Sequence, residues 1–479
     1  MTFKTPDWVK DAVFYQIFPD RFARSERVPK PSNLEPWDSP PTLYGFKGGD
    51  LLGVLERLDY LQDLGINAIY FNPIFQSTAN HRYHTYDYYQ VDPILGGNEA
   101  FRQLLDAAHR RGIRIVLDGV FNHTGRGFFP FAHILENGPA SPYLDWFSIK
   151  GFPLHAYASR RKPNYEAWWG LRALPKLNHD NPQVREFVMR VAEHWLREGI
   201  DGWRLDVPLE IETPGFWEEF RQRVKAVNPE AYIVAEIWDE AEEWLEGDHF
   251  DAVMNYVFSR AVWGFCGGEA LETSYRPGGF ILYPMNGQTF ARKMDRLLSL
   301  YPWEVTLVQL NLLDSHDTPR LINFFRGDRR RVRPAVLLQM TFPGAPCVYY
   351  GDEIGLEGGP DPDCRRAFPW DEERWDKELL DWYRRCIGLR SALPALRRGQ
   401  FRRLYADPAV YAFARPMSGE APVLVAVNVG EASATPVIPT RGLWPDGALL
   451  TDRLSGAVWS VSEGAVRPTI PPFSGVVLA

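Results

Sequence analysis

The stretch NEAFRQLLDAAHRRGIRIVLD, residues 98–118, contains the pattern that decides the fold. In its first part, apolar residues recur every three or four positions, which is the spacing of an amphipathic helix. A run rich in β-branched residues then follows a glycine and ends in an aspartate. We therefore expect a helix at Asn98–Arg111 and a buried strand at Ile113–Asp118.

The same alternation of helix and strand extends in both directions from this stretch. Strands that alternate with helices of this length form βαβ units with a parallel sheet. Eight such strands favour an α/β fold, a (β/α)8 TIM barrel, over an open sheet. The other expected strands are Val13–Phe18, Ala68–Phe71, Gly202–Asp206, Tyr232–Glu236, Ala252–Tyr256, Val308–Leu312 and Pro346–Tyr350, and the other expected helices are Leu51–Leu64, Gln183–Glu198 and Pro214–Val227.

Two segments depart from this alternation. Residues 123–177, rich in Pro, Gly and Trp, separate the third and fourth strands by far more than the usual connection of about 2–6 residues. We interpret them as an inserted subdomain over the mouth of the barrel, which itself takes residues 1–122 and 178–392. Short alternating runs separated by turn residues fill residues 393–479 and predict a C-terminal antiparallel β-sandwich.

Composition argues against several classes of function. A formal net charge of −8 offers no basic surface to nucleic acid or to an anionic membrane. No apolar run approaches the roughly 20 residues of a membrane span, and the N-terminus lacks the pattern of a secretory signal. The four cysteines form no CxxC pair, so the sequence supports neither a zinc site nor a redox motif. We expect a cytoplasmic protein with reduced thiols.

Acidic and histidine residues gather where the expected strands end. In a barrel of this type, the C-terminal ends of the strands carry the active-site groups. Buried carboxylates need partners, and Arg204, two residues before Asp206, lies on the same face of its strand. Each motif alone is more often a solvated strand end, but together they predict a catalytic pocket. The residues are Asp118, His123, Arg204, Asp206, Glu236, His316 and Asp317.

The motifs that carry these residues resemble the four conserved regions of glycoside hydrolase family 13, the α-amylase family. The resemblance implies a retaining glycosidase with Asp206 as nucleophile, Glu236 as general acid/base and Asp317 as the third carboxylate. It also implies that Arg204 orients the nucleophile and keeps it ionised. The matching segments are DGVFNH (118–123), GWRLDV (202–207), AEIW (235–238) and LLDSHD (312–317).

The resemblance also identifies side chains that are expected to touch the sugar at the cleavage point. His123 and His316 would contact its hydroxyl groups. Tyr83, in the segment NHRYHTYDYYQVDP (80–93), would stack on the same sugar beside His81. Asp118 and Trp238, which belong to the conserved motifs, are also expected to bind substrate.

A narrower resemblance is to the cyclomaltodextrinase, neopullulanase and maltogenic amylase subgroup. The segments LPKLN (174–178) and YYGDEIGLEGGPDPDCRR (349–366) are similar to stretches of that subgroup. They imply that Asp361 and Arg365 hold sugars on the non-reducing side, the alternative being an exposed salt bridge of little energetic value. Glu210, four residues after the nucleophile, would handle the acceptor.

Two features depart from the subgroup. Its extra N-terminal β-domain, which drives dimerisation, has no counterpart before the first strand, so that monomer and dimer both stay open. The segment DRFARSERVPKP (20–31) carries Arg and Lys where the family's calcium loop carries oxygen ligands, so we expect that calcium site to be absent. A cycle of two carboxyl groups requires neither a metal nor an organic cofactor.

The substrate implied by the resemblance is an α-glucan oligo- or polysaccharide, such as cyclodextrin, pullulan, maltooligosaccharide or starch. Cleavage would fall on α-1,4 bonds and, in this subgroup, also on α-1,6 bonds. A glucanotransferase, or a sucrose- or maltose-converting enzyme, would use the same covalent intermediate and stays open. So does an inactive glucan-binding protein on the same fold, although that alternative predicts the loss of a catalytic carboxylate.

Overall fold

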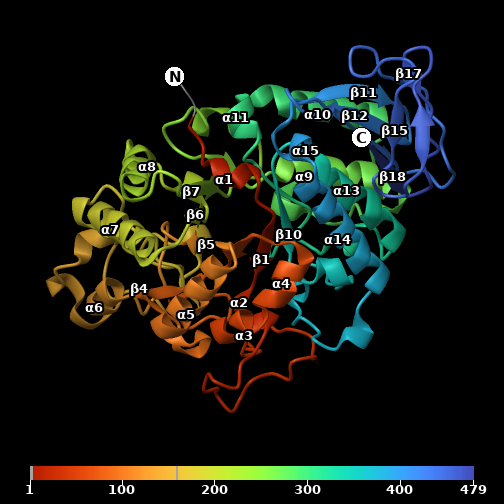
Figure 1. Cartoon of the computed structure of the whole chain (residues 1–479). Coiled ribbons are helices and arrows are strands. Elements are labelled where there is room, and N and C mark those ends of the chain that lie inside the picture. The colour runs from red at the N-terminus through yellow and green to blue at the C-terminus, as the bar shows by residue number, and fades with distance from the viewer. Residues whose placement is uncertain (1–3, 158–159) are drawn as a thin grey trace.

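The computed structural model describes residues 4–157 and 160–479 and has a barrel of eight parallel strands at its centre (Figure 1). Neighbouring strands follow the order β8-β7-β6-β5-β2-β1-β10-β9. A parallel bridge between Met254 and Leu310 closes the ring between β8 and β9. The (β/α)8 barrel is thus confirmed. Its strands are β1 (Phe14–Ile17), β2 (Ala68–Phe71), β5 (Arg114–Gly119), β6 (Gly202–Leu205), β7 (Tyr232–Ala235), β8 (Ala252–Val253), β9 (Leu310–Leu312) and β10 (Ala345–Tyr349).

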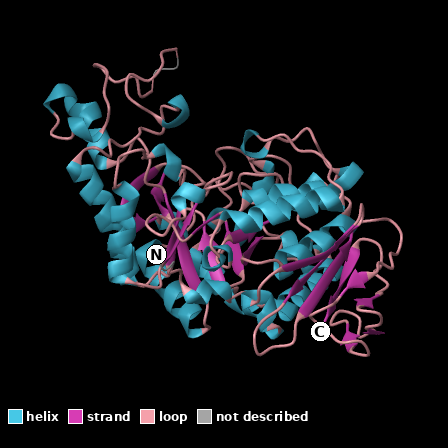
Figure 2. Ribbon diagram, turned by 90° about the horizontal axis from the view of Figure 1, so that it is seen from above, coloured by secondary structure: helices cyan, strands magenta, loops and turns pink. Residues whose placement is uncertain are grey.

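The barrel strands are buried on both faces. Phe14, Tyr70 and Val116 belong to the apolar cluster that fills the barrel interior. Their neighbours along the strands, such as Phe71 and Leu117, belong to the larger cluster between the strands and the surrounding helices. Figure 2 shows these helices flanking the strands. Burial on both faces explains why the strands are nearly continuous apolar runs in the sequence.

Most of the expected helices are present, namely α5 (Gly97–Arg110), α7 (Pro182–Glu198) and α8 (Phe216–Val227). One prediction was wrong, because the single helix expected at Leu51–Leu64 is two helices, α3 (Leu51–Leu55) and α4 (Leu58–Leu64). Arg57 leaves helical geometry, with φ −111° and ψ 9°, while all the leucines of the two helices except the partly buried Leu55 remain buried. The barrel is completed by α9 (Tyr256–Gly267), α10 (Gly287–Leu300), α13 (Val332–Thr341) and α14 (Lys377–Ala392).

Two excursions lie between barrel elements. After β2, the strands β3 (Phe75–Ser77) and β4 (Thr85–Val91) form an antiparallel hairpin that was not predicted, because its mixed burial hides any alternation. After β5, the chain forms α6 (Phe129–Asn137) and returns where His123 bridges Lys176. The insert therefore leaves and rejoins the barrel at one place. In Figure 1, α6 lies at the opposite end of the molecule from the C-terminal strands.

The C-terminal part is antiparallel, as expected. A four-stranded sheet has the order β11-β12-β13-β18, with β11 (Arg402–Ala406), β12 (Val410–Arg415), β13 (Val423–Asn428) and β18 (Ser474–Leu478). Two short pairs cover it, β14 (Ile438–Pro439) with β17 (Ala465–Val466) and β15 (Leu449–Thr451) with β16 (Val458–Ser460). Helix α13 of the barrel packs against β13 and β18. Across residues 4–157 and 160–479, no helix has the length and apolarity needed to cross a membrane.

Candidate active site

The carboxyl ends of the barrel strands bring together the acidic side chains that the sequence singled out. Asp118 lies in β5, Asp206 directly follows β6, and Glu236 directly follows β7. All three are buried. Asp317, in the loop after β9, has a side chain that is 32% exposed. Four acids from four strands therefore converge at one end of the barrel.

Arg204 is the cation at the centre of this cluster. Its Nη1 donates to both oxygens of Asp118, at 2.9 and 3.1 Å, and to Oδ1 of Asp206, at 3.0 Å. Its Nη2 lies 3.0 Å from Oε2 of Glu236, an ion-pair distance without hydrogen-bond alignment. The arginine side chain is fully buried. One guanidinium thus holds three carboxyl groups around it, which ties the ends of β5, β6 and β7 together.

The orientation of Glu236 depends on neutral donors as well. Its Oε2 accepts the backbone N–H of Val207 at 3.1 Å, and its Oε1 accepts the indole N–H of Trp238 at 3.1 Å. Trp238 is itself stacked on Tyr256, with ring centroids 3.6 Å apart. Val207 has φ +37°, a strained conformation for a β-branched residue. The residue that follows Asp206 is thus turned so that its N–H reaches Glu236.

A chain of hydrogen bonds connects the first barrel strand to Asp118. The Gln16 amide donates to Nδ1 of His316 at 2.9 Å, so the histidine proton is on Nε2. The Tyr83 hydroxyl accepts from that Nε2 at 2.5 Å and donates to Oδ2 of Asp118 at 2.8 Å. Burial, reinforced by nearby guanidinium groups, holds the pKa of His316 well below its usual value, so the ring is neutral. Tyr83 and His316 are thus joined to the acidic cluster through Asp118.

Asp361 and Arg365 are joined to the site rather than separate from it. Arg365 Nη1 pairs with Oδ1 of Asp361 at 2.9 Å, and its Nε donates to the backbone oxygen of His316 at 2.9 Å. Its Nη2 lies 3.4 Å from Oδ1 of Asp317. The Arg365 side chain is only 11% exposed. An isolated surface salt bridge does not describe this pair, because Arg365 holds the loop that carries Asp317.

The remaining expected residues lie at the edges of the cluster. Nδ1 of His81 accepts the backbone N–H two residues later, at 3.1 Å. Burial lowers the pKa of His123 to about 3, and its Nε2 has no hydrogen-bond partner among residues 4–157 and 160–479. Its ring is stacked on Trp168 of the insert, with centroids 5.1 Å apart. Glu210 is farther out, half-exposed, and 3.7 Å from Lys176 of the insert.

A comparison of sequences decides the family. The profile of the α-amylase catalytic domain matches residues 16–382. The chain belongs to the α-amylase family. The profile of a neopullulanase-like C-terminal domain matches residues 401–478, the region of the C-terminal sheets.

Relatives within the α-amylase family match nearly the whole chain. The cyclomaltodextrinase of Geobacillus thermopakistaniensis (strain MAS1) is 43% identical over 482 residues, which cover 100% of this chain and 78% of that protein. The structure of the Nostoc punctiforme debranching enzyme is 52% identical, with a TM-score of 0.92 and 100% of both chains covered. The cyclic α-maltosyl-(1→6)-maltose hydrolase of Arthrobacter globiformis is 39% identical, with a TM-score of 0.87 and 99% of both chains covered. The protein is an α-amylase-family glycoside hydrolase.

In this α-amylase-family site, three buried carboxyl groups face a single positive charge, that of Arg204. Burial raises the pKa values of Asp118, Asp206 and Glu236, and one guanidinium faces all three. Asp118 accepts hydrogen bonds from Arg204 and from two tyrosines, which favour its charged form. A proton retained by the cluster therefore belongs to the pair formed by Asp206 and Glu236.

Several residues that shape the site were missed at the sequence level. Tyr70 donates to Asp118 at 2.9 Å, Gln16 holds His316, and Tyr256 supports Trp238. Trp168 packs on His123 from the insert. Gln16 could have been found, because it is a polar residue in the middle of an apolar strand. The aromatic residues carried no such signal, since core positions use the same residue types.

The segment expected to lack a calcium site supplies its own cations. Arg21 Nε lies 2.8 Å from Oδ2 of Asp20, and Lys30 Nζ lies 2.8 Å from Oδ2 of the buried Asp50. Within the described ranges, no group of three or more His, Cys, Asp or Glu residues is arranged to hold a metal ion.

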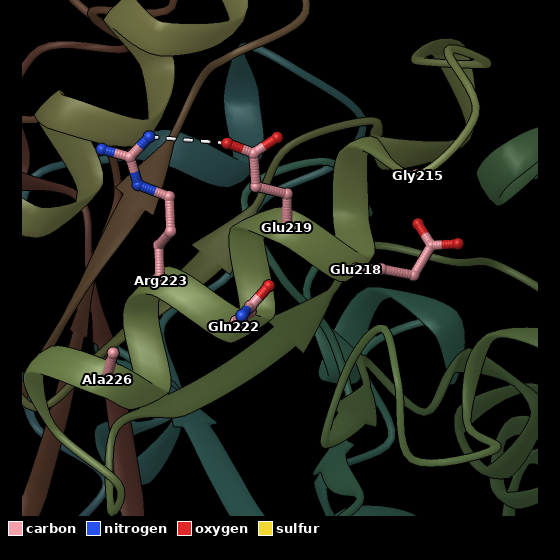
Figure 3. Close-up of a pocket in the computed structure, with 6 residues that line it drawn as sticks. All are labelled: Gly215, Glu218, Glu219, Gln222, Arg223 and Ala226. Carbon is pink, nitrogen blue, oxygen red and sulfur yellow. Dashed lines mark hydrogen bonds and ion pairs between the residues drawn. The ribbon is translucent and has the colours of Figure 1, made fainter.

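A hollow of about 550 Å³ on α8 lies away from this chemistry (Figure 3). The buried face of α8 carries Phe220 and Val224, so the hollow is on the solvent side of the helix. Arg223 there pairs with Glu219 at 3.4 Å, as Figure 3 shows, and with acids of α7. These contacts join two helices on the outside of the barrel. The lining residues are Gly215, Glu218, Glu219, Gln222, Arg223 and Ala226.

Proposed function

We propose that this enzyme hydrolyses α-1,4-glucosidic bonds, and α-1,6 bonds at branch points, by a retaining double displacement. The observation that carries the proposal is the single buried guanidinium of Arg204 between Asp206 and Glu236. A retaining glycosidase needs two carboxyl groups about 5–5.5 Å apart, one charged and one protonated. Asp206 and Glu236 follow neighbouring strands and face the same guanidinium, and we propose that Asp206 is the charged group and Glu236 the protonated one.

In the first step, an oxygen of Asp206 attacks the anomeric carbon and the glycosidic C–O bond breaks. Glu236 gives its proton to the leaving oxygen, so that the departing sugar carries a hydroxyl group. In the second step, Glu236 removes a proton from water as the water oxygen displaces Asp206 from the anomeric carbon. The N–H groups of Val207 and Trp238 favour the charged form of Glu236 that exists between the two steps.

The surrounding residues are proposed to bind the sugar at the cleavage point. Tyr83 offers a ring for stacking, and the neutral His123 offers a hydrogen bond to a hydroxyl group. The unpartnered Nε2 of His123 supports this role. Both ring nitrogens of His316 are engaged by Gln16 and Tyr83, so a sugar hydroxyl would have to replace one of these partners. Asp317, the most exposed of the acids, would accept hydroxyl protons of the same sugar.

Binding farther along the chain is assigned to either side of the cleavage point. Asp361 and Arg365 would hold sugars on the non-reducing side, adjacent to the loop of Asp317. Glu210 and Trp238 would contact the acceptor side. Glu210 lines a hollow of about 320 Å³ with residues of the insert, including Lys176, which gives an acceptor room to bind.

The names of the relatives support small cyclic and branched α-glucans as substrates. One relative is named a cyclomaltodextrinase, another a debranching enzyme, and a third a hydrolase of a cyclic maltose derivative with α-1→6 linkages. These names support hydrolysis rather than transfer to a sugar acceptor. A relative from Bacillus subtilis is named an intracellular maltogenic amylase, which supports a cytoplasmic location, as do four buried free cysteines. We propose that catalysis needs no metal or organic cofactor.

The roles of the two carboxyl groups are tested by Asp206→Asn and Glu236→Gln. Each is expected to lower kcat on β-cyclodextrin and on maltoheptaose by about 1000-fold or more, because each removes a group that one step requires. Circular dichroism checks that the variants are folded. Glu230→Gln is the matched control, an exposed acid at the opposite end of β7, and should leave kcat unchanged.

Products define the reaction further. Proton NMR of fresh digests should show α-anomers first, and side-by-side digestion should open cyclodextrins faster than starch is consumed. Near-normal turnover in either acid variant would remove that residue from the mechanism. First-formed β-anomers would rule out the covalent intermediate.

A further inference from the structure

One aromatic ring of the insert is more exposed than its surroundings explain. Trp169 has 80% of its surface exposed. Its backbone is in the left-handed region, with φ +49° and ψ +22°. At this exposure, the tryptophan side chain contributes little hydrophobic stabilisation to the fold. Its left-handed backbone conformation is also unfavourable for residues other than glycine. Strain of this kind persists where the surrounding structure enforces it, and it points to a function for the ring.

The ring continues a stack that begins in the active site. Trp169 lies on Trp168, with ring centroids 4.5 Å apart and planes 12° apart. Trp168 in turn lies on His123, at 5.1 Å and 18°. Both the indole N–H of Trp168 and Nε2 of the buried His123 lack hydrogen-bond partners within residues 4–157 and 160–479. The stack therefore leads from polar groups suited to sugar hydroxyls out to a free aromatic face.

The turn that carries Trp169 is tightly anchored. Ala167 and Pro175 bridge each other, Trp168 N–H donates to the Leu174 oxygen at 3.0 Å, and Gly170 N–H donates to the Ala167 oxygen at 2.9 Å. The next residue after Pro175, Lys176, bridges His123 in the segment that follows β5. The ring is thus fixed relative to the catalytic end of the barrel, and a ligand would lose little free energy in ordering it.

We propose that Trp169 is an outer binding platform for the glucan chain, on which a glucose unit beyond the catalytic cleft stacks its apolar face. A flat aromatic face presents apolar surface to a ligand without requiring charge, which suits a neutral sugar. Two rings separate this face from His123, so only a chain of several glucose units reaches it while bound at the cleavage point. The inference rests on the proposed glucan hydrolysis and adds a dependence on chain length.

The test compares substrates of different length. For each variant, kcat/KM is measured on maltoheptaose and on maltotriose, and the ratio of the two values is the readout. Trp169→Ala should lower that ratio by about fivefold to tenfold, the effect expected from losing one aromatic contact. Trp169→Tyr should retain most of it. Tyr157→Ala is the matched control, an exposed aromatic of the same insert whose ring faces Arg126, and should leave the ratio unchanged.

Binding is measured separately, so that failure of this inference and failure of the proposed function can be told apart. Isothermal titration calorimetry with maltoheptaose needs no turnover and should show a similar loss of affinity in Trp169→Ala. An unchanged ratio and unchanged affinity in folded Trp169→Ala would overturn the platform while leaving the hydrolase intact. If sedimentation shows that the variant instead dissociates a dimer, the ring belongs to an interface between two copies and the proposal is also overturned.

Discussion

Replacing Arg204 by methionine removes the charge that three buried carboxyl groups share. Asp118 and Asp206 lose their hydrogen bonds to the guanidinium, and Glu236 loses the cation 3.0 Å away. Methionine is of similar length, so little volume is lost. Each carboxyl group must then either remain charged without its partner or bind a proton. The state with the lower free-energy cost sets the loss of stability.

The cost of protonation gives the magnitude. For a carboxyl group with an ordinary pKa of 3.8, binding a proton costs about 4 kcal/mol at pH 7 and about 1.6 kcal/mol at pH 5, because one pH unit corresponds to about 1.36 kcal/mol. One extra proton thus predicts a loss of about 4 kcal/mol at pH 7, in agreement with about 3–5 kcal/mol for breaking a buried ion pair. Removing the cation raises the folded-state pKa values further. The deficit is therefore small at low pH and grows as the pH rises towards 7.

Urea unfolding of the wild type and of Arg204→Met at pH 5, 6 and 7 measures this difference. Arg390→Met is the matched control. Arg390 is equally buried but donates to backbone carbonyl groups, including that of Gly344 at 2.7 Å. Burial lowers the pKa of Arg390 to about 9, so Arg390 stays charged between pH 5 and 7. The stability lost in Arg390→Met should therefore be independent of pH over this range. If Arg204→Met lost as much stability at pH 5 as at pH 7, the idea of a shared cation among titrating acids would be wrong.

Two further predictions concern residues outside the catalytic cluster. Chelation with EDTA should change neither the melting temperature nor the activity, because Lys30 supplies the positive charge beside the buried Asp50. Lys30→Met should melt at a lower temperature than the wild type. A marked loss of activity on chelation would contradict the first expectation. Burial raises the pKa of Glu353 from 4.5 to about 7, with Tyr15 and Tyr60 donating to its Oε1 at 2.7 and 2.6 Å. Because the folded-state pKa is the higher one, the wild type loses about 3 kcal/mol of stability as the pH rises from 4.5 to 7. In thermal melts, the stability of Glu353→Gln should therefore increase relative to that of the wild type between pH 5 and pH 8. A difference in melting temperature that stays constant over this range would count against the raised pKa of Glu353.

The sequence predicted the barrel well because its signals are local. Each strand is an apolar run buried on both faces, and each helix carries its own period, so neither depends on knowledge of distant residues. The prediction was wrong at Leu51–Leu64, where apolar spacing continues through Arg57 although the backbone turns there. The hairpin of β3 and β4 was missed for a related reason, since half-buried strands without clean alternation leave no periodic signal.

The sequence by itself determined which acids end the strands, because the C-terminal end of a barrel strand is recognisable from the chain alone. Only the tertiary structure decided how charge is shared among them, since Arg204 meets three carboxyl groups from three strands. The turn of Val207 towards Glu236 and the stack from His123 to Trp169 are likewise matters of folding. Hydrogen-bond partners and burial depend on residues far apart in the chain, and these set the pKa values of the acids and the exposure of the Trp169 ring.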